Sequence, residues 1–410
     1  MIRFFSLFFC WTFFVFGSEK IELGVDVFFT EKHDLQWKDK KVGLITNQTG
    51  VDRDLQPTME LCKKNKNFSL VAIFSPEHGF TGAYHADEGI MNSLTKEGIP
   101  IYSLYGKTRR PTEEMLKNID VLFFDIQEIG TRSYTYINTL FFVMEEAAKK
   151  KIPVVVFDRP NPINGLVVDG PMLEKKWRSF IGYINIPYCH GMTIGELAKF
   201  FNEEYKISCD LRVVPMKHWK RWMSFSDTGL TWVPPSPHIP EAETVFFYPM
   251  TGILGELNIL NIGIGYTLPF KVVGAPWIDA KFFAEQLNQQ KLPGVSFVPF
   301  HYRPFYGAYK GEDCHGALIV LNDTKIYQPV AVQYVILGLL KSLYPKEFGE
   351  RLKLLKEPQK ELFCKANGTE KVYEILMKEK YPCWHLMKWN KKQKEEFVIL
   401  RKKYLFSEYD

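Results

Sequence analysis

The segment 74–82, FSPEHGFTG, places an acid and a histidine side by side, Glu77 and His78, at a predicted turn. Gly79 follows them directly, and glycine lets the backbone turn sharply because it has no Cβ. A carboxyl group that such a turn holds in a cleft can act as a general acid or base. The alternative is an acid solvated at the surface, so the position of this turn in the fold decides between the two.

A second group of polar residues lies in the segment 126–136, IQEIGTRSYTY. Glu128 could be the second carboxylate of a glycosidase pair, because such enzymes place two carboxyl groups across the scissile bond. Its alternative role is a local ion pair with Arg132, which contributes little if it is exposed. Tyr134 could stack on a sugar or hydrogen-bond to it, or it could pack in the core where a helix begins.

A third group, in the segment DRPNPING, contains Asp158, Arg159 and Asn161. Together with Arg132, Arg159 could bind an anionic group through bidentate hydrogen bonds. His190, in IPYCHGMT, precedes a predicted helix and either contacts the ligand or has a structural role.

The sequence gives little support for a metal or another cofactor. His78, His85, Asp87 and Glu88 are close in sequence, but glycines interrupt the segment and the spacing fits no HExxH-type helix. The segment GIGIGY does not match the dinucleotide-binding fingerprint, and no GxSxG nucleophile elbow occurs. We therefore expect neither a metal nor another cofactor.

The elements that must position these residues alternate between strands and helices. Apolar runs of strand length lie at 41–47, 68–75, 119–125 and 152–158, with helix-compatible segments between them. Continuous apolar runs are typical of parallel strands that are buried on both faces. The pattern therefore predicts an α/β fold with a Rossmann-like, doubly wound and mostly parallel sheet.

Three of these strands run directly into the polar segments described above. Ligands of open α/β sheets bind beyond the carboxyl ends of the strands, so we expect the three loops to form one crevice. The loops contain Glu77, His78, Glu128, Arg132, Tyr134, Asp158, Arg159 and Asn161.

The length of 410 residues and the 46% hydrophobic content suit two domains. A helix at 193–205 is predicted to begin with a capping box. The proline-rich segment 231–240, TWVPPSPHIP, indicates an extended crossing between domains. We place the boundary near residue 230, which gives a Rossmann-like domain at 18–230 and a smaller α+β C-terminal domain at 231–410.

The N-terminus has the pattern of a secretory signal peptide. Arg3 precedes an apolar run, and Val15 and Gly17 suit positions −3 and −1 of a cleavage site. The segment 1–17 is short for a membrane span. We expect an exported protein, periplasmic or secreted, without stable membrane insertion after cleavage.

Charge and cysteine content limit the classes of partner. The net charge of +5 is small, and the basic residues near the C-terminus alternate with acids on a predicted helix, which favours a solvated face over a nucleic-acid site. We expect no nucleic-acid partner.

The seven cysteines, Cys10 in the signal among them, include no CxxC pair. A zinc ribbon is therefore unsupported, and the disulfide connectivity stays open.

The same segments resemble a known family. VGLITNQTGV, IFSPEHGFTG, FDIQEIGTRSYTYINTL, DRPNPINGLVVDGP, WVPPSPHIP and GAPWID resemble, in order, the NamZ-type exo-β-N-acetylmuramidases, from about residue 21 to 406. The resemblance implies a Rossmann-like domain, a smaller C-terminal domain and an active-site pocket between them. It also implies release of N-acetylmuramic acid from the non-reducing end of peptidoglycan fragments, with Glu77 as the catalytic residue.

The chain departs from the family pattern at several positions. Glu128 stands where the family usually has Asp, and His238 stands where Asn is usual. Glu256 aligns with the first acid of a family motif, whereas Ile262 and Ile264 replace its second acid and its arginine. These changes affect the expected substrate preference more than the expected fold.

The leading hypothesis is therefore an exported glycoside hydrolase that acts on peptidoglycan-derived saccharides. Glu77 would protonate the leaving oxygen, and Glu128 or a nearby acid would assist, unless the 2-acetamido group of the substrate is the nucleophile. Arg132 or Arg159 would hold the lactyl carboxylate. The other predicted substrate-binding residues are His78, Tyr134, Asp158, Asn161, His190 and Glu256. The alternative is a periplasmic protein of the same fold that binds cell-wall fragments without cleaving them.

Overall fold

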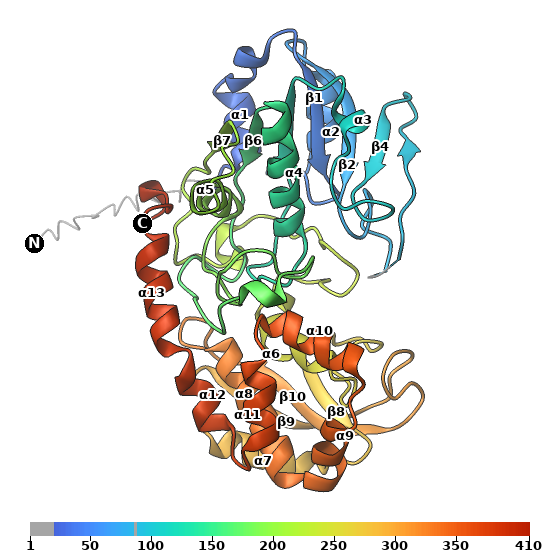
Figure 1. Cartoon of the computed structure of the whole chain (residues 1–410), viewed down its shortest axis with the longest axis vertical. Helices are drawn as coiled ribbons and strands as arrows, with labels where there is room; N and C mark the ends of the chain where they lie inside the picture. The colour runs from blue at the N-terminus through green and yellow to red at the C-terminus, as the bar shows by residue number, and fades with distance from the viewer. Residues whose placement is uncertain (1–19, 86–87) are drawn as a thin grey trace, which may run out of the picture.

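The protein is described by a computed structural model that covers residues 20–85 and 88–410 (Figure 1). The predicted signal peptide at 1–17, with Cys10, lies outside the described residues, and so does Asp87.

The N-terminal part is built around a seven-stranded sheet. Its strands are β1 (Lys41–Thr46), β2 (Ser69–Ser75), β3 (Ser93–Leu94), β4 (Pro100–Ser103), β5 (Val121–Asp125), β6 (Val154–Phe157) and β7 (Leu211–Val214). The strand order is β3-β4-β2-β1-β5-β6-β7, and only the pairing of β3 with β4 is antiparallel. The predicted, mostly parallel sheet is confirmed. The strands that follow β1 in the chain are added first on one side of it, as β2, β4 and β3, and then on the other side, as β5, β6 and β7. The direction in which the sheet grows therefore reverses at β1.

Helices cover both faces of this sheet (Figure 1), so the predicted double winding is confirmed. The helices of this part are α1 (Gly24–Thr30), α2 (Thr58–Lys64), α3 (Glu113–Leu116), α4 (Tyr136–Lys150) and α5 (Ile194–Glu204). On one face, Phe123 and Phe157 of the central strands pack against Phe28 of α1. On the other face, Phe124 and Val156 belong to the core that contains the buried side of α4. Alternate residues of one strand thus enter opposite layers.

Helix α5 begins as the sequence predicts. The Thr193 side chain accepts from the backbone N–H of Glu196, and the Glu196 carboxylate accepts in return from the Thr193 N–H at 3.0 Å. This capping box satisfies two backbone donors that the first turn leaves without helical partners.

The C-terminal part is a smaller α+β unit. Its strands β8 (Val272–Ala275), β9 (Val295–Tyr302) and β10 (Cys314–Leu321) form an antiparallel sheet in the order β8-β10-β9. Its helices are α6 (Thr244–Gly255), α7 (Ala280–Gln289), α8 (Pro329–Leu343), α9 (Arg351–Lys353), α10 (Glu357–Asn367), α11 (Lys371–Lys378), α12 (Cys383–Trp389) and α13 (Lys391–Arg401). The segment 231–240 contains no helix or strand, and the boundary near residue 230 stays a prediction.

The chain then returns to the larger domain. Helix α13 leads upward from the C-terminal part, and the last residues lie close to α5 (Figure 1). All six cysteines of the described part are free thiols. Within the described ranges, none of the helices has the length and apolar character needed to cross a bilayer.

Candidate active site

A cavity of about 450 Å³ lies between the two parts of the chain. One wall comes from loops at the carboxyl ends of β2, β4 and β5, and it contributes Glu77, Tyr105 and Thr135. The other wall comes from α6 and the segment after it, and it contributes Tyr248 and Glu256. The volume suits a sugar, because ligand cavities typically measure about 300–1,000 Å³.

The Glu77 carboxylate is held in place by hydroxyl groups. Glu77 lies two residues after the end of β2, in the turn that follows the strand, and it is 8% exposed. The Thr135 hydroxyl, just before α4, donates to Glu77 Oε2 at 2.6 Å. The Tyr105 phenol also hydrogen-bonds to Glu77. Two loops thus fix the orientation of this carboxylate.

Tyr105 lies between an anion and a cation. Its phenol hydrogen-bonds to both Glu77 and Arg109. The Arg109 guanidinium is itself held between two rings, 4.1 Å from the Tyr105 centroid and 4.0 Å from that of Phe180. Burial, followed by the charge of Glu77, raises the pKa of Tyr105 to about 12. Tyr105 therefore remains a hydrogen-bond donor throughout the neutral range.

His78 stabilises the turn that carries Glu77. Its backbone lies in the left-handed region with φ of 68°, and that of Gly79 has φ of 77°. His78 Nδ1 is 2.7 Å from the Tyr84 carbonyl, which can only accept, so Nδ1 carries the proton. In the neutral ring, Nε2 is then an acceptor.

The second wall brings another acid to the cavity. Tyr248 on α6 is partly buried, and this burial raises its pKa to about 12, with further contributions from the charges of Glu256 and Glu77. Both carboxylates therefore act on one phenol. Glu256 follows the last residue of α6, at the point where the chain turns along the cavity.

The rim and the remaining wall contain the residues that depart from the family pattern. Ile262 and Ile264 line the cavity, so this part of the wall is apolar. His238 also lines it, and its Nε2 lies 2.8 Å from the Tyr306 hydroxyl. Burial, together with the nearby His78 and His85, lowers the pKa of His238. His238 therefore contributes a neutral ring at neutral pH.

Glu128 lies outside this cavity, in a buried pair with His190. Its Oε2 accepts from the Gly130 N–H and lies 3.5 Å from His190 Nε2. His190 Nδ1 accepts from the Met192 N–H at 3.2 Å, so the proton of the neutral ring is on Nε2 and faces Glu128. Both side chains are almost fully buried, and their contacts are internal.

Arg132 also lies away from the cavity. Its guanidinium is fully buried and donates to the carbonyls of Pro171 and Ile186 in its own domain. It also donates to the carbonyls of Ala366 and Asn367 at the end of α10. Arg132 therefore joins the two domains. Its donors are used by backbone carbonyls, so it neither lines the cavity as a substrate-binding residue nor forms the alternative ion pair with Glu128.

Asp158 and its neighbours form a separate buried network. Asp158 accepts from the Thr193 hydroxyl at 2.8 Å, the Gly195 N–H at 2.8 Å and the Tyr409 hydroxyl at 2.7 Å. Arg159 forms a buried ion pair with Asp125 at 2.6 Å. The charge of Arg159 is therefore neutralised inside the domain.

Asn161 has a similar internal role, since its amide donates to the Met192 carbonyl and its oxygen accepts from the Ile163 N–H. The three loops thus do not share one crevice. Of the residues expected from the sequence, the cavity wall contains Glu77, His78, Tyr134 and Glu256.

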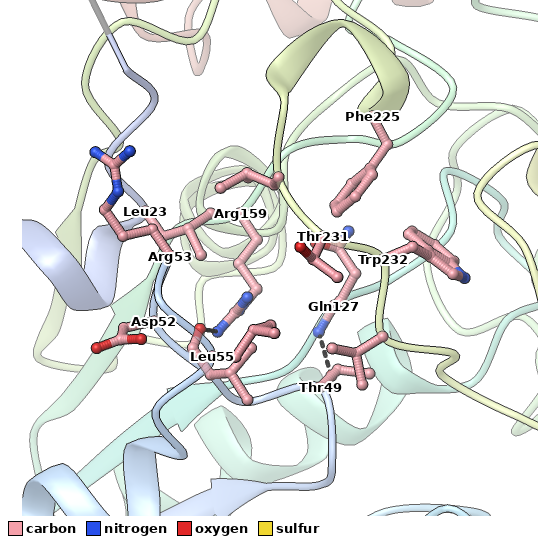
Figure 2. A pocket seen from close by; sticks show the side chains of 13 residues that line it. Leu23, Thr49, Asp52, Arg53, Leu55, Gln127, Arg159, Phe225, Thr231 and Trp232 are labelled. Atoms are coloured by element: carbon pink, nitrogen blue, oxygen red, sulfur yellow. Dashed lines mark hydrogen bonds between the residues drawn. The ribbon is translucent and has the colours of Figure 1, made fainter.

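The point where the sheet order reverses is filled by protein. A hollow of only about 20 Å³ remains there, room for about one water molecule. Figure 2 shows Phe225 and Trp232 beside Gln127, with Arg159 on the other side of the hollow. The rings of Phe225 and Trp232 pack edge to face at 4.7 Å. The usual binding position of a doubly wound sheet is thus occupied by the segment that leads to the C-terminal domain.

Sequence reasoning did not single out Tyr105, Thr135 or Tyr248. Tyr105 could have been found, because it follows the strand at 100–103 as Glu77 follows its own strand. Tyr248 lies on a helix that the sequence reading did not identify, and only the domain packing brings it to the cavity. Within residues 20–85 and 88–410, no group of His, Cys, Asp and Glu is arranged to hold a metal ion.

The whole chain is similar to known proteins over both domains. Residues 42–243 match the family described as exo-beta-N-acetylmuramidase NamZ, N-terminal, and residues 246–406 match its C-terminal counterpart. The chain is 44% identical over 330 residues to the peptidoglycan beta-N-acetylmuramidase NamZ of Bacillus subtilis (strain 168), covering 80% of this chain and 79% of that protein.

Two crystal structures of DUF1343 family proteins from Bacteroides fragilis NCTC 9343 have the same fold. The first has a TM-score of 0.87 and 40% identity and covers 94% of this chain and 99% of that chain. The second has a TM-score of 0.72 and 28% identity and covers 95% of this chain and 99% of that chain.

Proposed function

The chain belongs to the exo-beta-N-acetylmuramidase NamZ family of glycoside hydrolases, and from this premise we propose that it releases N-acetylmuramic acid from the non-reducing end of peptidoglycan fragments. The similarity to a peptidoglycan beta-N-acetylmuramidase supports this substrate class. A cavity bounded by two domains is compatible with an enzyme that accepts the end of a glycan.

Glu77 is the proposed general acid, which protonates the glycosidic oxygen as the bond breaks. The observation that carries this role is the hydroxyl-fixed carboxylate at the wall of the 450 Å³ cavity. A fixed carboxyl group is required because proton transfer needs hydrogen-bond reach to the leaving oxygen.

Glu256 is the proposed second carboxylate, in place of Glu128. Its support is that it lines the same cavity as Glu77 from the opposite wall, whereas Glu128 faces His190 inside the larger domain. Glycosidases need a second group, which acts as base, nucleophile or stabiliser of the oxocarbenium ion. Glu256 would provide that group or assist the 2-acetamido group of the substrate.

The test is turnover of a chromogenic muramic acid glycoside by Glu77→Gln, with Glu60→Gln as the control on the outer surface of α2. We expect Glu77→Gln to lower kcat by about 10²-fold or more, because general acid catalysis contributes roughly that factor. Glu60→Gln should retain normal turnover. Near-normal kcat in Glu77→Gln would reject the assignment.

Glu256→Gln and Glu128→Gln separate the two candidates for the second group. Both variants are assayed at a temperature where they remain folded. We expect kcat to fall in Glu256→Gln and not in Glu128→Gln. The reverse result, with loss only in Glu128→Gln, would return the role to Glu128.

We also propose that the protein is exported, on the basis of the charged, apolar and small-residue pattern of residues 1–17. Expression in a bacterial host with a cell envelope should yield a mature chain that begins at Ser18. Export would be contradicted if the protein stayed in the cytoplasm and N-terminal sequencing showed that it still begins at Met1.

A further inference from the structure

A second cavity of about 440 Å³ lies on the molecular surface, where three distant segments meet. The segment 164–169 and Trp222 come from the larger domain, the segment 325–329 leads into α8 and includes its first residue, and Lys394 lies on α13. Among the described residues, this cavity shares no lining residue with the active-site cavity. It is therefore a separate hollow with a volume suited to one or two sugar units.

The walls of this cavity expose large apolar side chains to water. Trp222 is 51% exposed, Leu166 57% and Ile326 54%. Contiguous exposed apolar groups around a hollow mark interaction sites more often than scattered ones do. An exposed indole face is also the group on which the apolar face of a sugar ring packs, because it offers a large flat surface with a polar edge.

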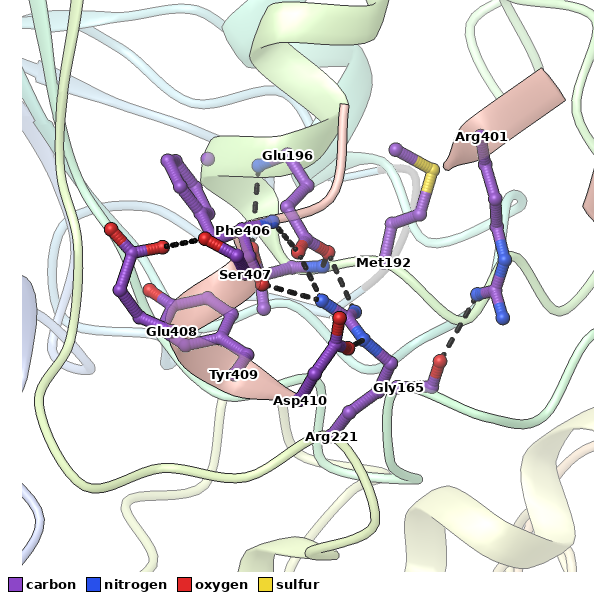
Figure 3. Close-up of polar contacts among 12 residues, drawn as sticks. Gly165, Met192, Glu196, Arg221, Arg401, Phe406, Ser407, Glu408, Tyr409 and Asp410 are labelled. Atoms are coloured by element: carbon purple, nitrogen blue, oxygen red, sulfur yellow. Dashed lines mark hydrogen bonds and ion pairs between the residues drawn. The ribbon is translucent and has the colours of Figure 1, made fainter. Parts of the chain in front are cut away.

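Trp222 is carried by a fixed backbone. Figure 3 shows its neighbour Arg221 directed toward the Glu196 carboxylate and Asp410. Arg221 bonds to both oxygens of Glu196, at 2.7 and 3.1 Å, and to Asp410 at 3.1 Å. The carbonyl of Arg221 accepts from the Gly165 N–H at 2.6 Å, which joins this segment to the opposite lip of the cavity.

The opposite lip is fixed in the same way. The Asn164 side-chain oxygen accepts from the N–H groups of Leu166 and Val167, both at 2.9 Å. The carbonyl of Gly165 accepts from Arg401 at 3.0 Å. Both apolar lips are thus preorganised, which lowers the entropy lost when a ligand binds.

Polar groups lie among these apolar side chains. Lys394 donates to Asp169 at 2.8 Å and remains partly exposed. Tyr327 also belongs to the lining, but its side chain is 3% exposed and its hydroxyl is buried, so it offers no hydrogen bond to a bound ligand. An aromatic surface with a few polar groups is the composition that recognises a saccharide.

We propose that this cavity is an ancillary saccharide-binding site, in which a sugar unit of the glycan packs on Trp222 and hydrogen-bonds to the Asp169–Lys394 pair. The choice of a saccharide rests on the proposed function, because the substrate of the active site is then a glycan. An exo-acting cavity engages only a chain end, whereas this site can hold an inner part of the same polymer. Binding there raises the effective concentration of chain ends at the active site.

The experiment compares the full-length mature protein with Trp222→Ala and with the matched control Trp384→Ala. Trp384 on α12 is also exposed, at 64%, and lines neither cavity. Binding to insoluble peptidoglycan is measured by sedimentation in the cold, with free N-acetylmuramic acid present to occupy the active site. Turnover of a small chromogenic muramic acid glycoside is measured in parallel.

We expect Trp222→Ala to bind peptidoglycan at least fivefold more weakly while its kcat/KM for the small glycoside stays within twofold of the original. Trp384→Ala should keep both properties. Ile326→Asn is a second variant of the same cavity, and it should also weaken peptidoglycan binding. It replaces Trp222→Ala as the test if thermal unfolding shows that Trp222→Ala is not stably folded.

Unchanged peptidoglycan binding in both folded cavity variants would overturn the proposal, and so would an equal loss in Trp384→Ala. A protein that binds peptidoglycan through Trp222 but does not cleave the small glycoside would instead reject the proposed function. The two failures are therefore distinguishable.

Discussion

At the scale of single residues, the position of Glu77 depends on side chains that carry no charge of their own. The Thr135 hydroxyl and the Tyr105 phenol both contact its carboxylate. Arg109 acts at one remove, through Tyr105, and is itself held by two aromatic rings. Catalysis by Glu77 should therefore be sensitive to the loss of one hydroxyl.

Tyr105→Phe removes that hydroxyl and leaves the ring that Arg109 packs against. We expect kcat to fall on the order of tenfold, because a hydrogen bond to a charged group contributes about 1.5–3 kcal/mol. The pKa of Tyr105, about 12, keeps it a hydrogen-bond donor to the Glu77 carboxyl group.

The measurement is kcat for Tyr105→Phe and for the control Tyr102→Phe. Tyr102 lies in β4 and packs on Phe74, away from the cavity wall. An unchanged kcat in Tyr105→Phe, or an equal fall in Tyr102→Phe, would mean that the phenol does not act on Glu77.

At the scale of elements, the N-terminus of α5 collects the polar groups that the sequence suggested for substrate binding. Asp158 accepts from Gly195, within the first turn of the helix, where backbone N–H groups and the helix dipole attract an anion. Glu196 caps Thr193 and also pairs with Arg221. These residues fasten α5 to the sheet and to the chain terminus.

Asp158 should make the stability of the protein depend on pH. Burial raises the pKa of Asp158 to about 7, whereas an unfolded aspartate titrates near about 3.9. The folded protein therefore binds this proton more tightly than the unfolded chain does. The resulting stabilisation is complete below about pH 4 and is lost as the pH rises through about 7, on the order of 4 kcal/mol in all.

Asp158→Asn removes this titration while keeping the size of the side chain. Relative to Asp158→Asn, the original protein should lose stability between about pH 4 and about pH 8. Urea unfolding at several pH values measures this difference. Parallel stability curves for the two proteins would exclude a protonated Asp158 in the folded state.

At the scale of the whole molecule, Arg132 and the C-terminal tail are among the contacts that bind the C-terminal part to the larger domain. Arg132 reaches the end of α10, and the C-terminal tail returns to α5 (Figure 3). The Tyr409 hydroxyl donates to Asp158, and its ring packs edge to face on Trp219 at 5.0 Å. Since the candidate active-site cavity lies between the same two domains, these contacts also fix its shape.

Arg132→Met tests this structural role. We expect it to lower the free energy of unfolding by about 3 kcal/mol, because it leaves buried carbonyls without a donor. At temperatures where the variant is folded, KM for a muramic acid glycoside should be unchanged, since Arg132 does not line the cavity. A large rise in KM with normal stability would instead support the original hypothesis that Arg132 holds the lactyl carboxylate.

The matched control is Arg303→Met. Arg303 pairs with Asp313 on the surface, with both side chains more than 60% exposed. An exposed pair contributes about 0–1 kcal/mol, so unfolding should change little. Equal effects of the two substitutions would mean that the buried contacts of Arg132 are not important for stability.

The sequence by itself determined the larger domain and the family. Apolar runs at 41–47, 68–75, 119–125 and 152–158 predicted β1, β2, β5 and β6, because hydrophobic periodicity is a local property of the chain. The capping box of α5 was equally local. The family motifs also identified the chain as a NamZ-type glycoside hydrolase, and the comparisons confirm that.

Only the tertiary structure decided which polar residues face the cavity. Glu77 and Glu128 both follow buried strands, yet one lines the cavity and the other faces His190. The partners of Arg132 and Asp158 are hundreds of residues away, at Asn367 and Tyr409. Local patterns specify an element and its buried face, but the direction and partners of a polar side chain depend on which distant segments pack against it.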